Sequence, residues 1–209
     1  MVHEGGHAVH SFLSRELPLT PFKSLTSEIA ELASMSMELI SMEYWEDIYP
    51  DEEELKRAKK EQLQGVLEVL PWVATIDAFQ HWLYENPNHT VEERHENWLK
   101  ISSRFSSNMV DWTDYPAYRN VTWQKQLHIY EVPFYYIEYG MAQLGAIAMW
   151  RNYKKDPVKT MEQYKAALAL GYTKSIPEVY ETAGIKFDFS MEYVSELATF
   201  VKEELAKLN

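Results

Sequence analysis

Two histidines and one glutamate near the amino terminus have the types and the spacing of a metal site. His3, Glu4 and His7 belong to the run His-Glu-Gly-Gly-His. Residues four apart on a helix share one side and lie about 6 Å apart along the axis, so both imidazoles can reach one ion. Glu4 is rotated by about 100° from His3 and points beside the ion, where a carboxylate can act as a base on water. The run therefore predicts metal-assisted hydrolysis.

The two glycines inside this run favour the functional interpretation. Gly5 and Gly6 each cost a helix about 1 kcal/mol relative to alanine, and a purely structural helix has no need of them. The close approach of a substrate backbone or of a neighbouring element would explain both residues. The alternative is a solvated surface helix that carries two histidines by chance.

A third ligand has to come from elsewhere in the chain, because a catalytic zinc ion usually has three protein ligands and one water. The chain has no Cys, which leaves His, Asp and Glu. His10 lies about 10.5 Å along the helix from His3, too far to share the ion, and is expected to be a core or supporting histidine. Glu31 is the preferred ligand, because it lies on a partly apolar helix face where an unpaired carboxylate is costly. Glu28 is the alternative, although it can equally stabilise the start of that helix.

Further residues around these candidates refine the prediction. Ser34 and Glu38 share the helix face of Glu31 and can supply supporting contacts, for example to a ligand imidazole. The metzincin class of proteases requires a Gly three residues after the second ligand histidine and a His six residues after it. This sequence has His10 and Leu13 at those positions, so the metzincin class is excluded.

The sequence around the candidate site resembles the thimet oligopeptidase and oligoendopeptidase F family of zinc metallopeptidases, most closely its bacterial oligoendopeptidase F branch. The resemblance is carried by HEGGHAVH (3–10), AELASMSME (30–38), HIYEVPFYYIEYGMAQ (128–143) and LGYTKSIPEVYETAGI (170–185). It implies that one Zn²⁺ per chain is bound by His3, His7 and Glu31. It also implies that Glu4 is the general base and that oligopeptides are the substrates.

A cluster of tyrosines follows His128. One interpretation is a packed aromatic helix, because each tyrosine buries a large area and needs one hydrogen bond. The other is catalytic, because tyrosine O–H and histidine N–H groups can stabilise the oxyanion that forms when water attacks a peptide carbonyl. The resemblance implies that Tyr139 is the principal donor, with Tyr136 one turn before it and His128 in the preceding loop. The register of Tyr130 and Tyr135 against the family stays open.

The elements that must position these residues are predicted to be helices, because helical periodicity dominates and alternating segments are scarce. We expect one all-α domain over residues 1–209 without an internal boundary. Loops are expected over 15–25 and around 85–89, an irregular segment over 108–120, and a restart or kink at Pro71. The helices are expected over about 1–13, 26–49, 51–70, 71–84, 90–106, 134–155, 157–171, 175–184 and 190–208.

Composition excludes several classes of partner. The chain has 20 Lys and Arg against 32 Asp and Glu, a net charge of −12. This excess argues against nucleic acid and anionic membranes as partners, and it suggests a mild preference for basic or neutral peptides. No segment approaches the run of about 20 apolar residues that a membrane span needs, and no secretory signal opens the chain. The cytoplasm is the expected compartment.

The position of the motif at residue 3 leads to expectations about length. Members of the resembling family have extensive helical structure before this motif, so we expect the chain to be the carboxy-terminal catalytic portion with the amino-terminal part absent. Reduced activity and self-association through exposed apolar surface would follow. One alternative is a catalytically inactive helical module that binds a peptide or a partner. A two-metal helical bundle is disfavoured, because Glu92 and His95 form a Glu-x-x-His pair that no second pair accompanies.

Overall fold

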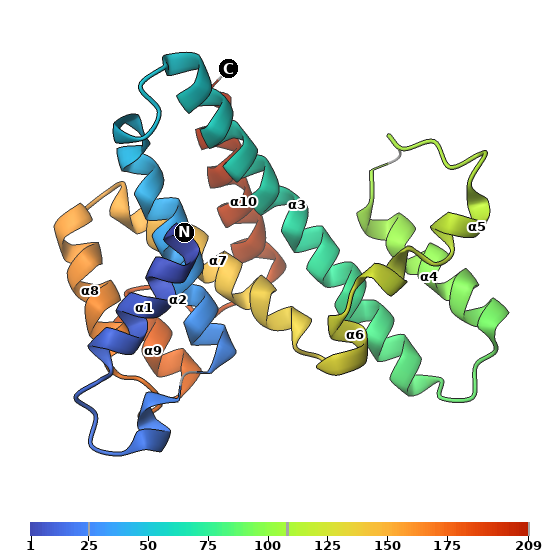
Figure 1. Ribbon diagram of the computed structural model, residues 1–209, viewed down its shortest axis with the longest axis horizontal. Helices are drawn as coiled ribbons and strands as arrows, with labels where there is room; N and C mark the ends of the chain where they lie inside the picture. The colour runs from blue at the N-terminus through green and yellow to red at the C-terminus, as the bar shows by residue number, and fades with distance from the viewer. Residues whose placement is uncertain (25, 108, 209) are drawn as a thin grey trace. The chain divides into compact units, whose positions relative to one another are not determined.

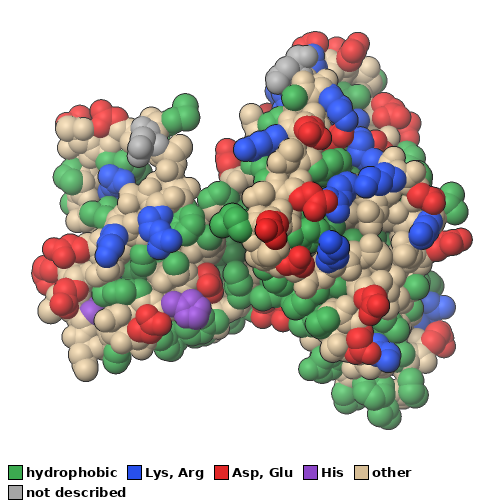
Figure 2. Space-filling view, turned by 180° about the vertical axis from the view of Figure 1, so that it is seen from behind, with side chains coloured by type: hydrophobic (Ala, Val, Ile, Leu, Met, Phe, Trp, Pro, Cys, Tyr) green, Lys and Arg blue, Asp and Glu red, His purple; other side chains and the backbone are tan. Residues whose placement is uncertain are grey.

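A computed structural model describes residues 1–24, 26–107 and 109–208, which form helices joined by loops (Figure 1). These ranges contain ten α-helices and three short 3-10 helices and no strand, so the predicted all-α fold is confirmed. No helix in the described part of the chain is both long and apolar enough to span a membrane. Acidic and basic side chains are interspersed over the face seen in Figure 2.

The chain divides into two compact units. Unit 1 comprises Met1–Leu67 and Met141–Asn209, and unit 2 comprises Glu68–Gly140. The chain passes from one unit to the other within α3 (Glu52–Glu85) and again within α7 (Tyr136–Tyr153). Folding of all 209 residues as one domain stays a prediction.

Unit 1 holds the two helices that carry the predicted metal ligands. The first, α1 (Val2–Leu13), lies against α2 (Ser27–Ser41) and also contacts α8. The core beneath them contains fully buried apolar side chains such as Leu32, Ile147 and Leu197. The remaining elements of unit 1 are η1 (Thr20–Lys23), η2 (Met42–Asp47), the start of α3, the end of α7, α8 (Pro157–Ala169), α9 (Ile176–Thr182) and α10 (Met191–Ala206).

Unit 2 has an aromatic core of its own. The ring of Phe79 contacts the rings of Trp98 and Trp123, with centroids 5.1 and 5.5 Å away. A capping box starts α4 (Val91–Phe105), because Thr90 and Glu93 exchange side-chain and backbone hydrogen bonds. The elements of unit 2 are the end of α3, α4 (Val91–Phe105), α5 (Pro116–Arg119), η3 (Thr122–Lys125), α6 (His128–Glu131) and the start of α7.

Three predicted boundaries are wrong. The predicted restart at Pro71 is absent, because α3 continues through this residue and packing of the following turns, such as Phe79, offsets the missing hydrogen bond; a kink at Pro71 stays a prediction. The helix predicted to reach residue 49 ends as α at Ser41 and tightens into η2. The helix predicted over 134–155 begins at Tyr136, not at Phe134, because Phe134 has a left-handed φ of 61° that a right-handed helix cannot include. Leu25 and Asn108, which fall in predicted non-helical segments, lie outside the described residues.

Candidate metal centre

The close approach of α1 and α2 depends on Gly6. A Cβ built on this residue would lie 2.5 Å from Ser34 Cα and 2.8 Å from the carbonyl oxygen of Ala33. Real Cβ atoms essentially never come so near to another heavy atom, so the bare Gly6 backbone lets the two helices touch. Of the two reasons that the sequence offered for this glycine, the neighbouring element is therefore the right one.

Gly5 has a different environment. A Cβ on this residue would meet nothing within 4 Å in the described part of the chain. Packing within the chain therefore accounts for Gly6 and leaves Gly5 unexplained. Its neighbour Glu4 is exposed and lies outside the cluster that the two histidines form.

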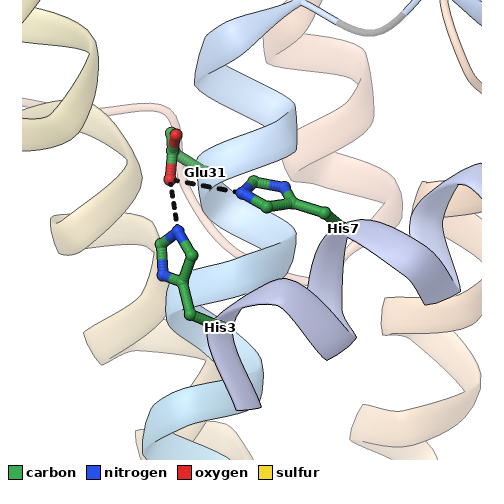
Figure 3. Close-up of side chains that lie close together, drawn as sticks. All are labelled: His3, His7 and Glu31. Carbon is green, nitrogen blue, oxygen red and sulfur yellow. Dashed lines mark ion pairs between the residues drawn. The ribbon is translucent and has the colours of Figure 1, made fainter. Parts of the chain in front are cut away.

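The helix pair brings His3, His7 and Glu31 together (Figure 3). Glu31 Oε2 lies 3.4 Å from His3 Nε2 and 3.9 Å from His7 Nε2. One potential ligand atom from each side chain lies within 4.8 Å of the other two. The Glu31 residue is 8% exposed, whereas the two histidines are partly exposed. Three donors from two helices thus converge on a point at the edge of the helix pair.

This donor set fits a zinc ion. Zinc binds imidazole nitrogen and carboxylate oxygen at about 2.0–2.2 Å, so ligand atoms at tetrahedral angles lie about 3.4 Å apart. The two measured distances from Glu31 Oε2, 3.4 and 3.9 Å, are close to that separation. A buried carboxylate beside two imidazoles is also costly unless a cation or a proton compensates its charge.

Two side chains of α2 support the donors, as the sequence predicted. Ser34 Oγ donates a hydrogen bond to Glu31 Oε2 at 3.0 Å. Glu38 Oε1 lies 3.4 Å from His3 Nδ1, on the side of the ring away from Glu31. Burial raises the pKa of the Glu38 carboxyl, although His3 acts in the opposite direction. A carboxylate in this position holds the proton of His3 on Nδ1 and leaves the lone pair of Nε2 to bind a metal.

The alternative ligands have other surroundings. Glu28 does not belong to the cluster, and its charge contributes, after burial, to the raised pKa of the Tyr180 phenol. His10 is fully buried, and neither ring nitrogen has a hydrogen-bond partner in the described residues. Burial, and secondarily His7, lowers the pKa of His10 to about 4. His10 is therefore a neutral core histidine, one of the two roles that the sequence predicted.

Within unit 2, the predicted catalytic side chains form an aromatic group. His128 of α6 contacts Tyr136 and Tyr139 of α7, with ring centroids 5.0 and 5.7 Å apart. The Tyr139 hydroxyl lies 3.4 Å from His128 Nε2. Burial raises the pKa of the Tyr136 phenol, so its hydroxyl keeps its proton. Tyr135 also stacks near His128, at 6.0 Å.

Tyr130 belongs to a different contact. Its ring stacks on Trp123 with centroids 5.7 Å apart, and the side chain is exposed. The tyrosines that accompany His128 in unit 2 are therefore those of the later segment, 135–139. Their catalytic role stays a prediction.

A polar chain that sequence reasoning missed orients His128. Trp72 Nε1 donates to Gln126 Oε1 at 3.1 Å, and Gln126 Nε2 lies 2.6 Å from His128 Nδ1. An indole N–H can only donate, which fixes Gln126 Oε1 as the acceptor and Gln126 Nε2 as a donor. His128 Nδ1 then accepts and Nε2 carries the ring proton. The only sequence signal was a Gln two residues before the histidine.

Comparisons with known proteins identify a family and several similar structures. The model of one protein family, peptidase family M3, matches residues 1–199. A search of curated proteins finds no match. A solved structure provisionally named oligoendopeptidase F is similar over 98% of this chain, with a TM-score of 0.85 and 29% identity. Pz peptidase A, solved with an inhibitor, is similar over 97% of the chain, with a TM-score of 0.84 and 29% identity.

A further similar structure is provisionally named oligoendopeptidase F from Bacillus anthracis, with a TM-score of 0.79 and 27% identity over 99% of this chain. The matches cover 36%, 36% and 33% of those three proteins. The chain thus spans about a third of the length of the solved structures it matches.

Proposed function

Because the chain belongs to peptidase family M3, we propose that it hydrolyses peptide bonds within oligopeptides, with one Zn²⁺ held by His3, His7 and Glu31. The observation that carries this proposal is the convergence of three donor atoms within 4.8 Å of one another, with Glu31 buried between the helices. A bound zinc ion supplies a Lewis acid for a carbonyl and lowers the pKa of a water.

The remaining residues of α1 and α2 prepare the donors and move the proton. Glu38 fixes the ring of His3, and Ser34 fixes the carboxylate of Glu31. Both metal ligands are therefore already oriented before the ion binds. Glu4, exposed on α1 next to His3, accepts the proton of the attacking water. It then delivers that proton to the leaving amine.

We further propose that His128, Tyr136 and Tyr139 donate hydrogen bonds to the oxyanion of the tetrahedral intermediate. Support comes from the tautomer that Gln126 imposes, because it makes His128 Nε2 a donor. Each such donor contributes a few kcal/mol to stabilising the transition state.

Partners and compartment follow from the same proposal. Oligopeptides are the substrates, and the net charge of −12 favours basic or neutral ones over acidic ones. The proposal includes no nucleic acid or membrane partner and places the protein in the cytoplasm. Self-association through exposed apolar side chains, such as Phe12 at 62% exposure, stays a prediction that size-exclusion chromatography can test.

The test is the substitution Glu4→Gln, which keeps the shape of the side chain and removes its basicity. We expect unchanged zinc content and a rate of cleavage of a quenched fluorescent peptide that falls at least about a hundredfold. Glu53→Gln, at an exposed position of α3, is the matched control and should leave the rate unchanged. Near-normal activity of Glu4→Gln would remove Glu4 from the mechanism.

Chelator completes the experiment. Cleavage that disappears with chelator and returns with zinc supports a metallopeptidase. Zinc binding without any cleavage by the unsubstituted chain would instead favour the alternative of a helical module that binds peptides and does not hydrolyse them. The similar structures are about three times as long as this chain, so this outcome has to be tested directly.

A further inference from the structure

Unit 2 contains a cavity that the proposed reaction does not use. Its volume is about 320 Å³, and its walls come from α3, α4, the segment between α4 and α5, α5 itself, and η3. The side chains that matter for its chemistry are three tryptophans, two cations and a hydroxyl: Trp72, Trp98, Trp112, Arg119, Lys125 and Thr122. No Asp or Glu is among the described residues that line it.

The aromatic walls have their polar atoms already paired. Trp98 Nε1 donates to Thr122 Oγ1 at 2.9 Å and to the carbonyl oxygen of Arg119 at 3.2 Å. Trp72 Nε1 donates to Gln126. Both indoles are thereby fixed in orientation and offer ring carbon to the cavity. An occupant is expected to place an apolar or aromatic group against them.

The two cations give the cavity a positive charge within an acidic chain. Lys125 Nζ lies 4.4 Å from the ring centroid of Trp72, a cation–π contact that holds the ammonium group at the wall. In the described residues, neither Arg119 nor Lys125 has a carboxylate within ion-pair distance, whereas Lys154 pairs with two glutamates. The nearby Asp111 accepts two hydrogen bonds from Thr113.

We propose that this cavity binds a carboxylate that carries an apolar, preferably aromatic, group. A planar guanidinium matches a carboxylate through two parallel hydrogen bonds, and the ammonium of Lys125 adds a second charge. The volume lies at the small end of ligand sites, about 300–1,000 Å³, so the occupant is about one or two amino-acid residues in size. The free carboxy-terminal residue of a peptide and a small aromatic acid share this chemistry.

Over the part of the molecule that holds α4 and α5, Figure 2 shows basic side chains beside apolar ones near the middle and acidic side chains around them. Such a surface attracts anions in spite of the net charge of −12, because the nearest charges dominate at physiological ionic strength. The proposal concerns residues of unit 2 alone and does not depend on the metal cluster.

The experiment measures binding of N-acetyl-phenylalanine and of its carboxamide by calorimetry and by the shifts of indole N–H signals in NMR spectra. We expect the acid to bind and the amide to bind at least tenfold more weakly. The double substitution Arg119→Met and Lys125→Met should weaken binding of the acid at least tenfold. Lys100→Met, at an exposed position of α4 away from the cavity, should change it less than twofold.

Chelator distinguishes the cavity from the metal cluster, and peptide length distinguishes one kind of occupant from the other. Binding of the acid that persists with chelator supports the cavity, and binding that disappears with chelator assigns the carboxylate to the metal and overturns the proposal. If the occupant is a peptide terminus, a hexapeptide that ends in a free phenylalanine should bind. If the occupant is a small acid, the free acid should bind and the hexapeptide should not. Equal affinity for acid and amide, or no affinity for either, overturns the proposal. If circular dichroism shows that the double variant is unfolded, the affinity of the single variant Lys125→Gln for the acid is used instead.

Discussion

Replacing Gly6 by alanine should separate the two helices that form the metal cluster. The added Cβ would lie 2.5 Å from Ser34 Cα, whereas ordinary contacts begin at 3.4 Å. Backbone atoms of α2 cannot turn aside as a side chain can, so α1 has to move away by about 0.9 Å, the difference between these distances. His3 and His7 move with α1, while Glu31 stays on α2.

The magnitude follows from two opposing effects. Overpacking of this kind costs about 1–3 kcal/mol, and the better helix propensity of alanine returns about 1 kcal/mol. A net loss of about 0–2 kcal/mol remains, which lowers the melting temperature of a chain of this size by up to about 8 °C. Ligand distances in metal sites tolerate about 0.2 Å, so a displacement of about 0.9 Å should weaken zinc binding at least about tenfold.

Gly5→Ala is the matched control for Gly6→Ala. Its Cβ meets nothing within 4 Å of the described residues, so it should raise the melting temperature by about 2–4 °C and leave zinc affinity unchanged. Melting is measured by circular dichroism with chelator present, and zinc affinity by competition with a chromophoric chelator. If Gly6→Ala binds zinc and melts as the unsubstituted chain does, helix contact at Gly6 does not set the geometry of the cluster.

Three further predictions concern ligand identity, orientation and pH. Glu31→Ala should lose zinc by elemental analysis, whereas Glu28→Ala should keep it; the reverse result would exchange their roles. Gln126→Leu should increase the fraction of His128 protonated on Nδ1, read from ¹⁵N chemical shifts, and an unchanged tautomer would exclude the orienting chain. Hydrogen bonds from Ser175, then Lys174, lower the pKa of Glu178 to about 2. Its stabilisation is therefore present above about pH 4.3 and lost as the pH falls through about 2, so the melting difference from Glu178→Gln should vanish there.

The metal cluster could be predicted from the sequence because its parts are close in the chain and follow helix geometry. The separation of four residues between His3 and His7 places them on one face, and Glu31 lies on the next α-helix along the chain. The polar neighbours Ser34 and Glu38 follow at helical spacing, and both make the expected contacts. Each of these predictions uses only the helical period and one short connection between helices, so few other arrangements of these side chains are possible.

The surroundings of His128 could not be predicted in the same way. Gln126 is held by Trp72, a residue 54 positions earlier, and no local period links them. The same holds for Phe134, whose left-handed φ separates α6 from α7 although nothing in its residue type favours that conformation. At Pro71 a strong local signal predicts a break that the helix does not have. Packing of residues distant in the sequence, within unit 2, overrides that signal.

These differences explain why the two parts of the proposed mechanism have unequal support. The donors His3, His7 and Glu31 come from helices that pack directly and whose contact is fixed at a single glycine. Their geometry is thus a property of unit 1 alone, and it predicts zinc binding by this chain whether or not it cleaves peptides. The proposed oxyanion donors belong to unit 2, where Trp72 and Gln126 orient His128. Zinc affinity and cleavage should therefore respond to different substitutions: Gly6→Ala should impair both, and Gln126→Leu should impair cleavage alone.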